Sequence, residues 1–122
     1  SNFIKCNNMA MMIQRGRVLV RINTQKNHIE YSTDGGRCWH SRYTGSSCGS
    51  FYDLFDFGKE LLCCCAKGIY YSTDEGRCWH SRYTSSSCGM FQQLAADGSR
   101  ILATTKKGLY YSTDGGRCWH KR

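Results

Sequence analysis

Short runs of alternating apolar and polar residues, separated by glycine-containing turns, make up most of the chain. In the middle of the sequence four such runs follow one another, at 51–57, 60–66, 69–72 and 78–83. Ile69 and Tyr71 fall on one face by the period of two that a β-strand requires. The pattern therefore predicts a unit of four short strands joined by tight turns.

This unit occurs three times in the chain. The segment from Tyr31 to His40 recurs at 71–80 and 111–120, a spacing of 40 residues, and the copies differ only where Glu75 replaces a glycine. Equal spacing and a repeated turn are typical of β-propeller blades, whereas a β-sandwich, the alternative, requires neither. We therefore predict an all-β fold of three four-stranded antiparallel blades, at about 6–47, 48–87 and 88–122.

Each unit contains the same turn, Ser-x-Asp-x-Gly-x-Cys-Trp. In the first copy, the carboxylate of Asp34 is expected to accept backbone N–H bonds within the turn, and Gly36 to supply a conformation that other residues resist. Trp39 can bury its ring beneath the hairpin. We expect a structural role for all copies of this set: Ser32, Asp34, Gly36, Trp39, Ser72, Asp74, Gly76, Trp79, Ser112, Asp114, Gly116 and Trp119.

This turn resembles the Asp-box, or BNR repeat, of sialidase-like and related propellers. It departs from that family at Cys38, Cys78 and Cys118, where the family usually has threonine. Cysteine is small and readily buried, so the departure puts no strain on the fold. The resemblance implies that the boxes lie at the periphery of each blade, between its third and fourth strands, and are neither catalytic nor metal sites.

Three blades do not close a ring, because propellers typically have about four to eight. An open arc would expose two sheet faces. Either two chains form a homodimer with six blades, the number found in sialidases, or the chain belongs to a longer propeller. We favour the homodimer, because the three units fill the chain almost from end to end.

Catalysis is not expected. By resemblance, sialidase-like chemistry needs an arginine cluster, a tyrosine nucleophile with a glutamate partner, an acid/base aspartate and a proline-containing motif, and this chain has no proline. Its only glutamates, Glu30, Glu60 and Glu75, are predicted in or beside turns or outer strands. Near-identical blades are also a poor basis for an asymmetric active site.

Pairs of cysteine and histidine recur with the turn. Cys38 and His40, like their copies at 78–80 and 118–120, would lie on one face of a predicted strand and supply half of a tetrahedral zinc site. Equivalent residues of different blades lie far apart around a ring, so the pairs cannot share an ion. We expect a buried cysteine beside an exposed histidine, and no metal or other cofactor.

Three further cysteines, Cys6, Cys48 and Cys88, open the innermost predicted strands. They indicate either a ring of thiols at the channel mouth, with a metal or redox role, or small residues required by crowding, which we favour. The total of nine cysteines is odd and leaves a thiol unpaired. This favours a reducing compartment such as the cytoplasm.

The chain is basic, with 17 Lys and Arg against 9 Asp and Glu, a net charge of +8. Such an excess favours an anionic partner such as nucleic acid, acidic glycan or lipid headgroup, with a solvated basic surface as the alternative. No run approaches the roughly 18 apolar residues that a membrane span needs.

Six arginines recur with the repeat and are the candidate anion-binding residues: Arg37, Arg77, Arg117, Arg42, Arg82 and Arg122. Rotational copies of one arginine would form a belt of positive charge, and Tyr43 and Tyr83 beside it could add stacking. The structural alternative is a cation–π contact between each arginine and the neighbouring tryptophan.

The sequence therefore predicts a non-catalytic propeller that acts as a binding or scaffold module, with an anionic molecule as partner. The alternative is a glycan-binding or degenerate sialidase-like protein. A third class, an assembly factor like the Asp-box propellers of photosynthetic membranes, rests on analogy of fold alone.

Overall fold

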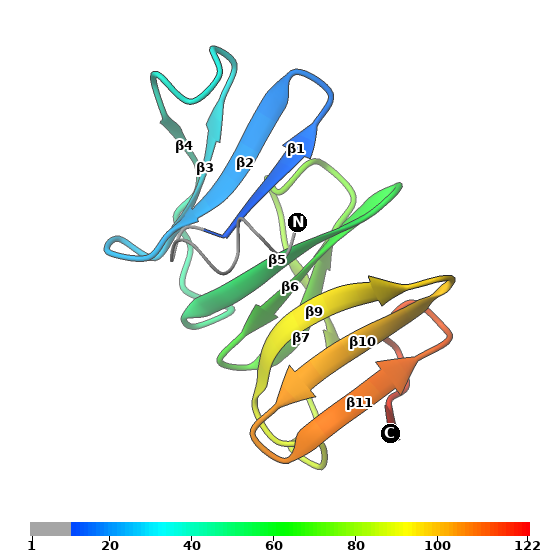
Figure 1. Ribbon diagram of the computed structural model, residues 1–122. Helices are drawn as coiled ribbons and strands as arrows, with labels where there is room; N and C mark the ends of the chain where they lie inside the picture. The colour runs from blue at the N-terminus through cyan, green and yellow to red at the C-terminus, as the bar shows by residue number, and fades with distance from the viewer. Residues whose placement is uncertain (1–10) are drawn as a thin grey trace.

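The computed structural model describes residues 11–122, which form three four-stranded antiparallel sheets (Figure 1). Blade 1 consists of β1 (Met12–Arg15), β2 (Val18–Asn23), β3 (His28–Ser32) and β4 (His40–Tyr43). Blade 2 consists of β5 (Phe51–Phe57), β6 (Glu60–Cys65), β7 (Gly68–Ser72) and β8 (His80–Tyr83). Blade 3 consists of β9 (Phe91–Asp97), β10 (Arg100–Thr105), β11 (Gly108–Ser112) and β12 (His120–Lys121). The all-β fold with three four-stranded blades is confirmed.

Within each blade the strands pair in chain order, so every connection is a hairpin. The predicted start of blade 1 at residue 6 lies outside the described residues. No helix that is long and apolar enough to cross a membrane occurs among residues 11–122.

The fourth strand of blade 2 is shorter than predicted. In blade 2 it begins at His80 and not at Cys78. The backbone N–H of Cys78 donates to Oδ1 of Asp74 at 2.9 Å, so it is committed to the turn and cannot join the sheet. The indole of Trp79 donates to the carbonyl of Gly76 at 3.0 Å, which folds this residue back under the same turn.

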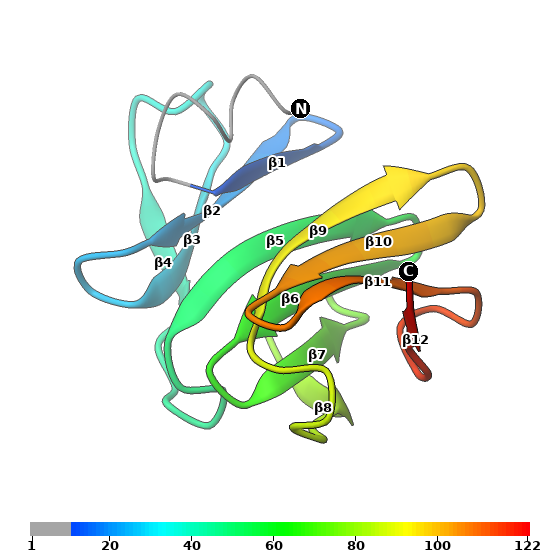
Figure 2. The same cartoon turned by 60° about the horizontal axis from the view of Figure 1, so that its bottom comes forward.

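The three blades stack in chain order, with blade 2 between the other two (Figures 1 and 2). Among the described residues, the main contacts between blades come from their first two strands, and β5 runs beside both β1 and β9. The blades therefore converge on the side of their first strands, as the blades of a propeller converge on its axis.

Each blade has two faces, and we call the one that carries the Asp-box tryptophan the front face. The front face of blade 2, with Leu61, Cys63 and Trp79, packs on Val20 and Ile22 from the back of blade 1, and we call this interface the first seam. The second seam joins the back of blade 2 to the front of blade 3 and buries a second apolar cluster, which includes Leu62, Cys64, Ile69, Phe91, Leu94, Ile101 and Trp119.

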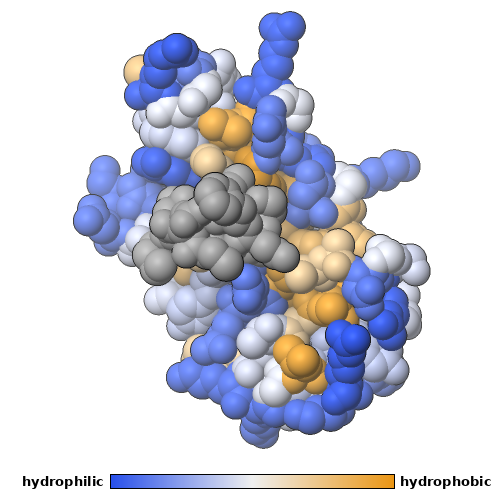
Figure 3. Space-filling model, viewed as in Figure 1, coloured by the Kyte–Doolittle hydropathy of each residue, from blue (hydrophilic) through white to orange (hydrophobic). Residues whose placement is uncertain are grey.

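The two outermost faces differ from the buried ones. On the front of blade 1, Glu30 accepts bonds from Arg21 at 3.0 Å and Asn23 at 3.1 Å, and the Arg21 guanidinium lies 3.9 Å from the centre of the Trp39 ring. On the back of blade 3, Leu109 is 51% exposed. Figure 3 shows hydrophobic side chains gathering around β5 and β9, with hydrophilic ones around them.

Candidate functional site

The Asp boxes are hydrogen-bonded corners between the third and fourth strands. In blade 3 the hydroxyl of Ser112 donates to Oδ1 of Asp114 at 2.8 Å and accepts the N–H of Gly116 at 2.9 Å. Asp114 also accepts the N–H of Cys118 at 2.9 Å. This backbone bond and the serine hydroxyl hold the pKa of Asp114 at about 2, because they stabilise the ionised carboxylate. The other two boxes repeat the same bonds.

The tryptophans anchor these corners to the blade. Each indole N–H donates to the carbonyl of the box glycine at 2.9–3.0 Å. Trp79 and Trp119 are buried in the seams, whereas Trp39 is half-buried on the front of blade 1. All side-chain bonds of the boxes point inward to the turn, so the structure places these residues as supports of the hairpin.

The expectation for the box cysteines is wrong on two points. Cys38, Cys78 and Cys118 are exposed, and each precedes the fourth strand, so cysteine and histidine do not share a strand face. The reason is that each cysteine closes the outer edge of its turn beside the aspartate of the box. In blade 1 the hydrogen bond to Asp34 raises the pKa of Cys38. His40 instead lies against Tyr31, with ring centroids 5.3 Å apart.

A ring of thiols at the channel mouth, the alternative that we did not favour, does not form among the described residues. Cys48 lies in the apolar cluster of the first seam and Cys88 in that of the second. Cys6 lies outside the described residues. Cys48 has sulfur neighbours of a different origin, Cys63 and Cys65 of β6.

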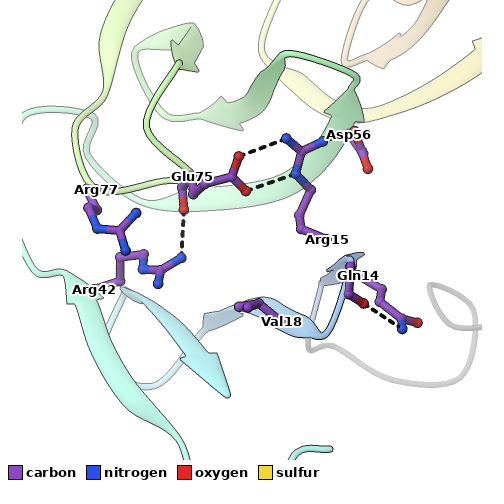
Figure 4. A pocket seen from close by; sticks show the side chains of 8 residues that line it. Gln14, Arg15, Val18, Arg42, Asp56, Glu75 and Arg77 are labelled. Atoms are coloured by element: carbon purple, nitrogen blue, oxygen red, sulfur yellow. Dashed lines mark hydrogen bonds and ion pairs between the residues drawn. The ribbon is translucent and has the colours of Figure 1, made fainter. Parts of the chain in front are cut away.

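The six candidate arginines do not form a continuous belt. Four of them form two pairs, and each pair lies across one seam. Arg42 at the end of blade 1 lies beside Arg77 from the box of blade 2 (Figure 4). Arg82 and Arg117 repeat this arrangement at the second seam, where the positive charges of both lower the pKa of Glu60. The remaining two arginines, Arg37 and Arg122, lie on the outer blades, and both are exposed.

Cation–π contacts are present, but with tyrosine as partner. The guanidiniums of Arg42 and Arg82 lie 4.0 and 4.1 Å from the ring centres of Tyr31 and Tyr71. The box arginines instead donate to the backbone of their own turns, as Arg77 does to the carbonyl of Asp74 at 3.0 Å. The predicted stacking on tryptophan is therefore wrong for these arginines.

Tyr43 and Tyr83 are not available for stacking on a ligand. Each ring packs edge-on against the first phenylalanine of the next blade, Phe51 or Phe91, at centroid distances of 6.0 and 5.8 Å. Both tyrosines therefore help to close the seams.

A polar cavity of about 480 Å³ opens at the first seam. Its lining includes Arg15, Val18, Arg42, Asp56, Glu75 and Arg77 (Figure 4). Arg15 reaches across from blade 1 and forms two bonds to the Glu75 carboxylate, at 3.0 and 2.8 Å, and one to Asp56 at 2.8 Å. Both acidic side chains that line the cavity are therefore already paired with Arg15.

Arg42 remains on the other side of Glu75. It donates to the Glu75 backbone carbonyl at 3.1 Å, and within residues 11–122 it forms no ion pair. Burial, with a smaller contribution from Arg77, lowers the pKa of Arg42. At the second seam the equivalent Arg82 is neutralised by Glu60, with bonds of 2.6 and 2.7 Å.

One substitution explains the difference between the seams. The position that holds Glu60 in blade 2 is occupied by Val18 in blade 1, as the shared glycine turns at 16 and 58 show. The first seam therefore keeps a pair of arginines without an acidic partner of this kind. It is the strongest candidate for a binding site in the described part of the chain.

The residues that make this seam distinct were not among the predicted site residues. Glu75 was the one variable position of the Asp box, and it has a φ of 65°, in the region that its glycine counterparts occupy. A side chain kept there against its conformational preference indicates a compensating contact, here with Arg15. Alignment of the glycine turns would have shown Arg15 opposite Phe57 and Val18 opposite Glu60.

The fold and its repeated corners define consecutive blades of a β-propeller of the Asp-box type. The family model described as BNR/Asp-box repeat matches residues 30–41, 70–81 and 110–121. The chain therefore carries three BNR repeats, and its blades are of the BNR type. No curated protein sequence matches the chain significantly.

Several solved propeller structures resemble the chain. YCF48 from Cyanidioschyzon merolae superposes with a TM-score of 0.68 at 18% identity, over 93% of this chain and 37% of that one. A structure of YCF48 bound to D1 peptide gives 0.67 at 16% identity, over 93% of this chain and 40% of the other. A GH74 enzyme from Niastella koreensis gives 0.57 at 20% identity, over 86% of this chain and 17% of the other. The chain thus spans well under half of each, and the likeness concerns the fold.

Proposed function

We propose that the chain is a non-catalytic propeller module that binds an acidic peptide segment through the arginine pair of the first seam. The observation that carries this proposal is the pair Arg42 and Arg77, which faces a polar cavity while the nearby carboxylates are bound by Arg15. The YCF48 structure with a bound peptide supports a peptide as the ligand class, since it has the same type of fold.

The geometry of Arg42 suits recognition of a carboxylate. Its guanidinium is held over the Tyr31 ring and fixed by one bond to the Glu75 carbonyl, so little side-chain freedom is lost when a ligand binds. The other guanidinium nitrogens can donate to two oxygens at once, which gives both affinity and orientation. Arg77 adds a second cation from the adjacent blade.

Matched variants from the repeat test the site. R42Q and R77Q should weaken binding of an Asp/Glu-rich peptide, measured by fluorescence anisotropy, whereas R117Q at the second seam, where Glu60 neutralises Arg82, should not. Binding should also weaken as salt rises, because charge attraction is screened. An R117Q effect as large as that of R77Q, or affinity independent of salt, would reject the arginine pair as the site.

The same assay separates the peptide from a glycan. An acidic oligosaccharide of similar charge is titrated in parallel with the peptide. Preference for the oligosaccharide that is lost in R42Q would replace the peptide by a glycan as the ligand, and the alternative of a glycan-binding relative would be adopted.

We further propose that a second copy completes the ring. The two outer faces support this, because blade 3 offers the exposed Leu109 and blade 1 the half-buried Trp39. Joining them would also bring Arg122 beside Arg37 of the second copy, in the arrangement seen at the seams. Light scattering should then give twice the mass of the chain, and L109E should lower it to one. A monomer at all concentrations would contradict this.

Absence of catalysis is part of the same proposal. The carboxylates of Glu60 and Glu75 are held in ion pairs with arginine, which lower their pKa values. A general acid needs the opposite shift, toward a raised pKa. Hydrolysis of sialosides by the purified chain would contradict the proposal.

A further inference from the structure

Three buried thiols meet in the first seam. Cys63 and Cys65 lie on the front face of β6, and Cys48 comes from the connection before β5. Their sulfur atoms all lie within 4.8 Å of one another, and all three side chains are fully buried. The surroundings of this thiol cluster are apolar and include Tyr43 and Tyr70, whereas those of the arginine pair are polar.

Blade 3 shows what the fold itself requires at these positions. Cys63 pairs with Tyr70 and Cys65 with Gly68, just as Ala103 pairs with Tyr110 and Thr105 with Gly108. Blade 3 also has a cysteine, Cys88, in the place of Cys48. The second seam therefore packs well with one thiol, one methyl group and one hydroxyl, and packing alone does not call for three thiols.

The three thiols face one another within the apolar cluster of the first seam. Cys65 donates to the carbonyl of Gly68 at 3.3 Å. The three sulfur atoms are therefore near enough to one another for a single ion to contact all of them.

The three sulfur ligands determine which metal ion the cluster can bind. Sulfur ligands select soft ions such as Cu(I) and zinc. Zinc in structural sites is almost always bound by four ligands, and among the described residues no histidine or carboxylate joins the three thiols. Cu(I) has no such requirement for a fourth ligand, because it is softer than zinc and carries a single charge, and three sulfur donors satisfy it.

We propose that Cys48, Cys63 and Cys65 form a three-sulfur site for one Cu(I) ion. Binding joins the ion to three sulfur atoms and releases their thiol protons to solvent. The copper stays in the Cu(I) state throughout, so no electron is transferred. The bound ion would link blade 1 to blade 2 through the connection that carries Cys48.

The test uses the full chain, reduced and free of metal, with Cys38, Cys78 and Cys118 replaced by serine to remove the exposed thiols. Cu(I) is titrated in competition with a coloured Cu(I) chelator under anaerobic conditions. We expect one equivalent to bind, with a sulfur-to-copper charge-transfer band in the ultraviolet, three sulfur neighbours by X-ray absorption and a higher melting temperature. Failure to compete with the chelator would overturn the proposal.

The decisive variant is C63A/C65T, which copies the residues of blade 3. It should lose the bound equivalent, with affinity falling by more than the roughly 10- to 100-fold that loss of a mere supporting group costs. Undiminished binding would show that other cysteines hold the ion. A zinc ion that displaces Cu(I) and takes a fourth ligand would likewise overturn the three-sulfur assignment.

A second variant decides the matter if C63A/C65T does not fold, as circular dichroism would reveal. A103C/T105C leaves blade 2 intact and builds the same trio around Cys88. It should bind two equivalents of Cu(I), and an unchanged stoichiometry would count against the proposed geometry.

Discussion

Glu75 offers a quantitative test of how the first seam is held together, because it combines a favourable ion pair with an unfavourable backbone. Its φ of 65° is one that Gly35 and Gly115 adopt without cost, at 75° each. E75G removes both the ion pair with Arg15 and the strain. E75Q removes the charge but keeps the strain, since glutamine also has a Cβ.

The magnitudes follow from exposure and conformation. The Glu75 side chain is 42% exposed, so its pair with Arg15 is worth about 0.5–1 kcal/mol. A left-handed conformation costs a residue with a Cβ about 1–2 kcal/mol. Glycine in turn loses about 0.5–1 kcal/mol more on folding, through its freer unfolded chain. E75Q should therefore lower the free energy of unfolding by about 0.5–1 kcal/mol, whereas the opposing terms leave E75G within about 0.5 kcal/mol of the parent.

Urea unfolding at low salt measures the free energy of unfolding of both variants. The test is whether E75G is at least as stable as E75Q. An E75G chain less stable than E75Q by more than about 1 kcal/mol would refute the assignment of strain to this residue. G115E is the matched control, because the position equivalent to Arg15 in the second seam is Phe57. It introduces the strain without Arg15 as a partner, and the smaller entropy loss on folding offsets only part of that strain, so G115E should be destabilised by about 0.5–1 kcal/mol.

Other contacts give further predictions. S112A removes a buried hydroxyl that accepts the N–H of Gly116 and should lower stability by about 1–3 kcal/mol in urea unfolding, and an unchanged midpoint would contradict this. D53A removes a fully buried carboxylate that accepts the N–H of Leu94 across the second seam at 2.8 Å, and should cost about 2–4 kcal/mol, more than D53N. The folded pKa of Asp114, about 2, lies below the unfolded value of about 3.9, so its stabilisation is present above pH 4 and lost as pH falls toward 2. Acid unfolding should be less steep in D114N, and identical acid profiles for the two proteins would argue against this role.

The repeat made the fold predictable, because a turn that recurs every 40 residues fixes both strand number and connection order. The strand ranges of blade 2 were right to within about two residues, and the error at Cys78 has a local cause in the Asp box, whose carboxylate captures the backbone N–H. The alternation of apolar and polar residues cannot predict this hydrogen bond. It indicates which side of the sheet a side chain faces and not which acceptor the backbone N–H binds.

The candidate site was less predictable, because it depends on differences between copies and not on what they share. Arg42 and Arg82 have the same sequence surroundings, and only Val18 against Glu60, far earlier in each unit, decides which is neutralised. The contact of the thiols of Cys48 and Cys63 likewise depends on a strand and a connection coming together. Neither follows from a motif.

Near-identical blades pose a problem of order during folding, since each could dock on the wrong neighbour and lead to swapped or misassembled chains. The few residues that differ between the copies counter this error. Blade 3 docked directly on blade 1 would place Gly115 opposite Arg15, which would lose its carboxylate, and the N–H of Leu94 would lose Asp53. The residues that differ between the seams therefore make the docking of blades specific, because each blade keeps all of its contacts with only one neighbour.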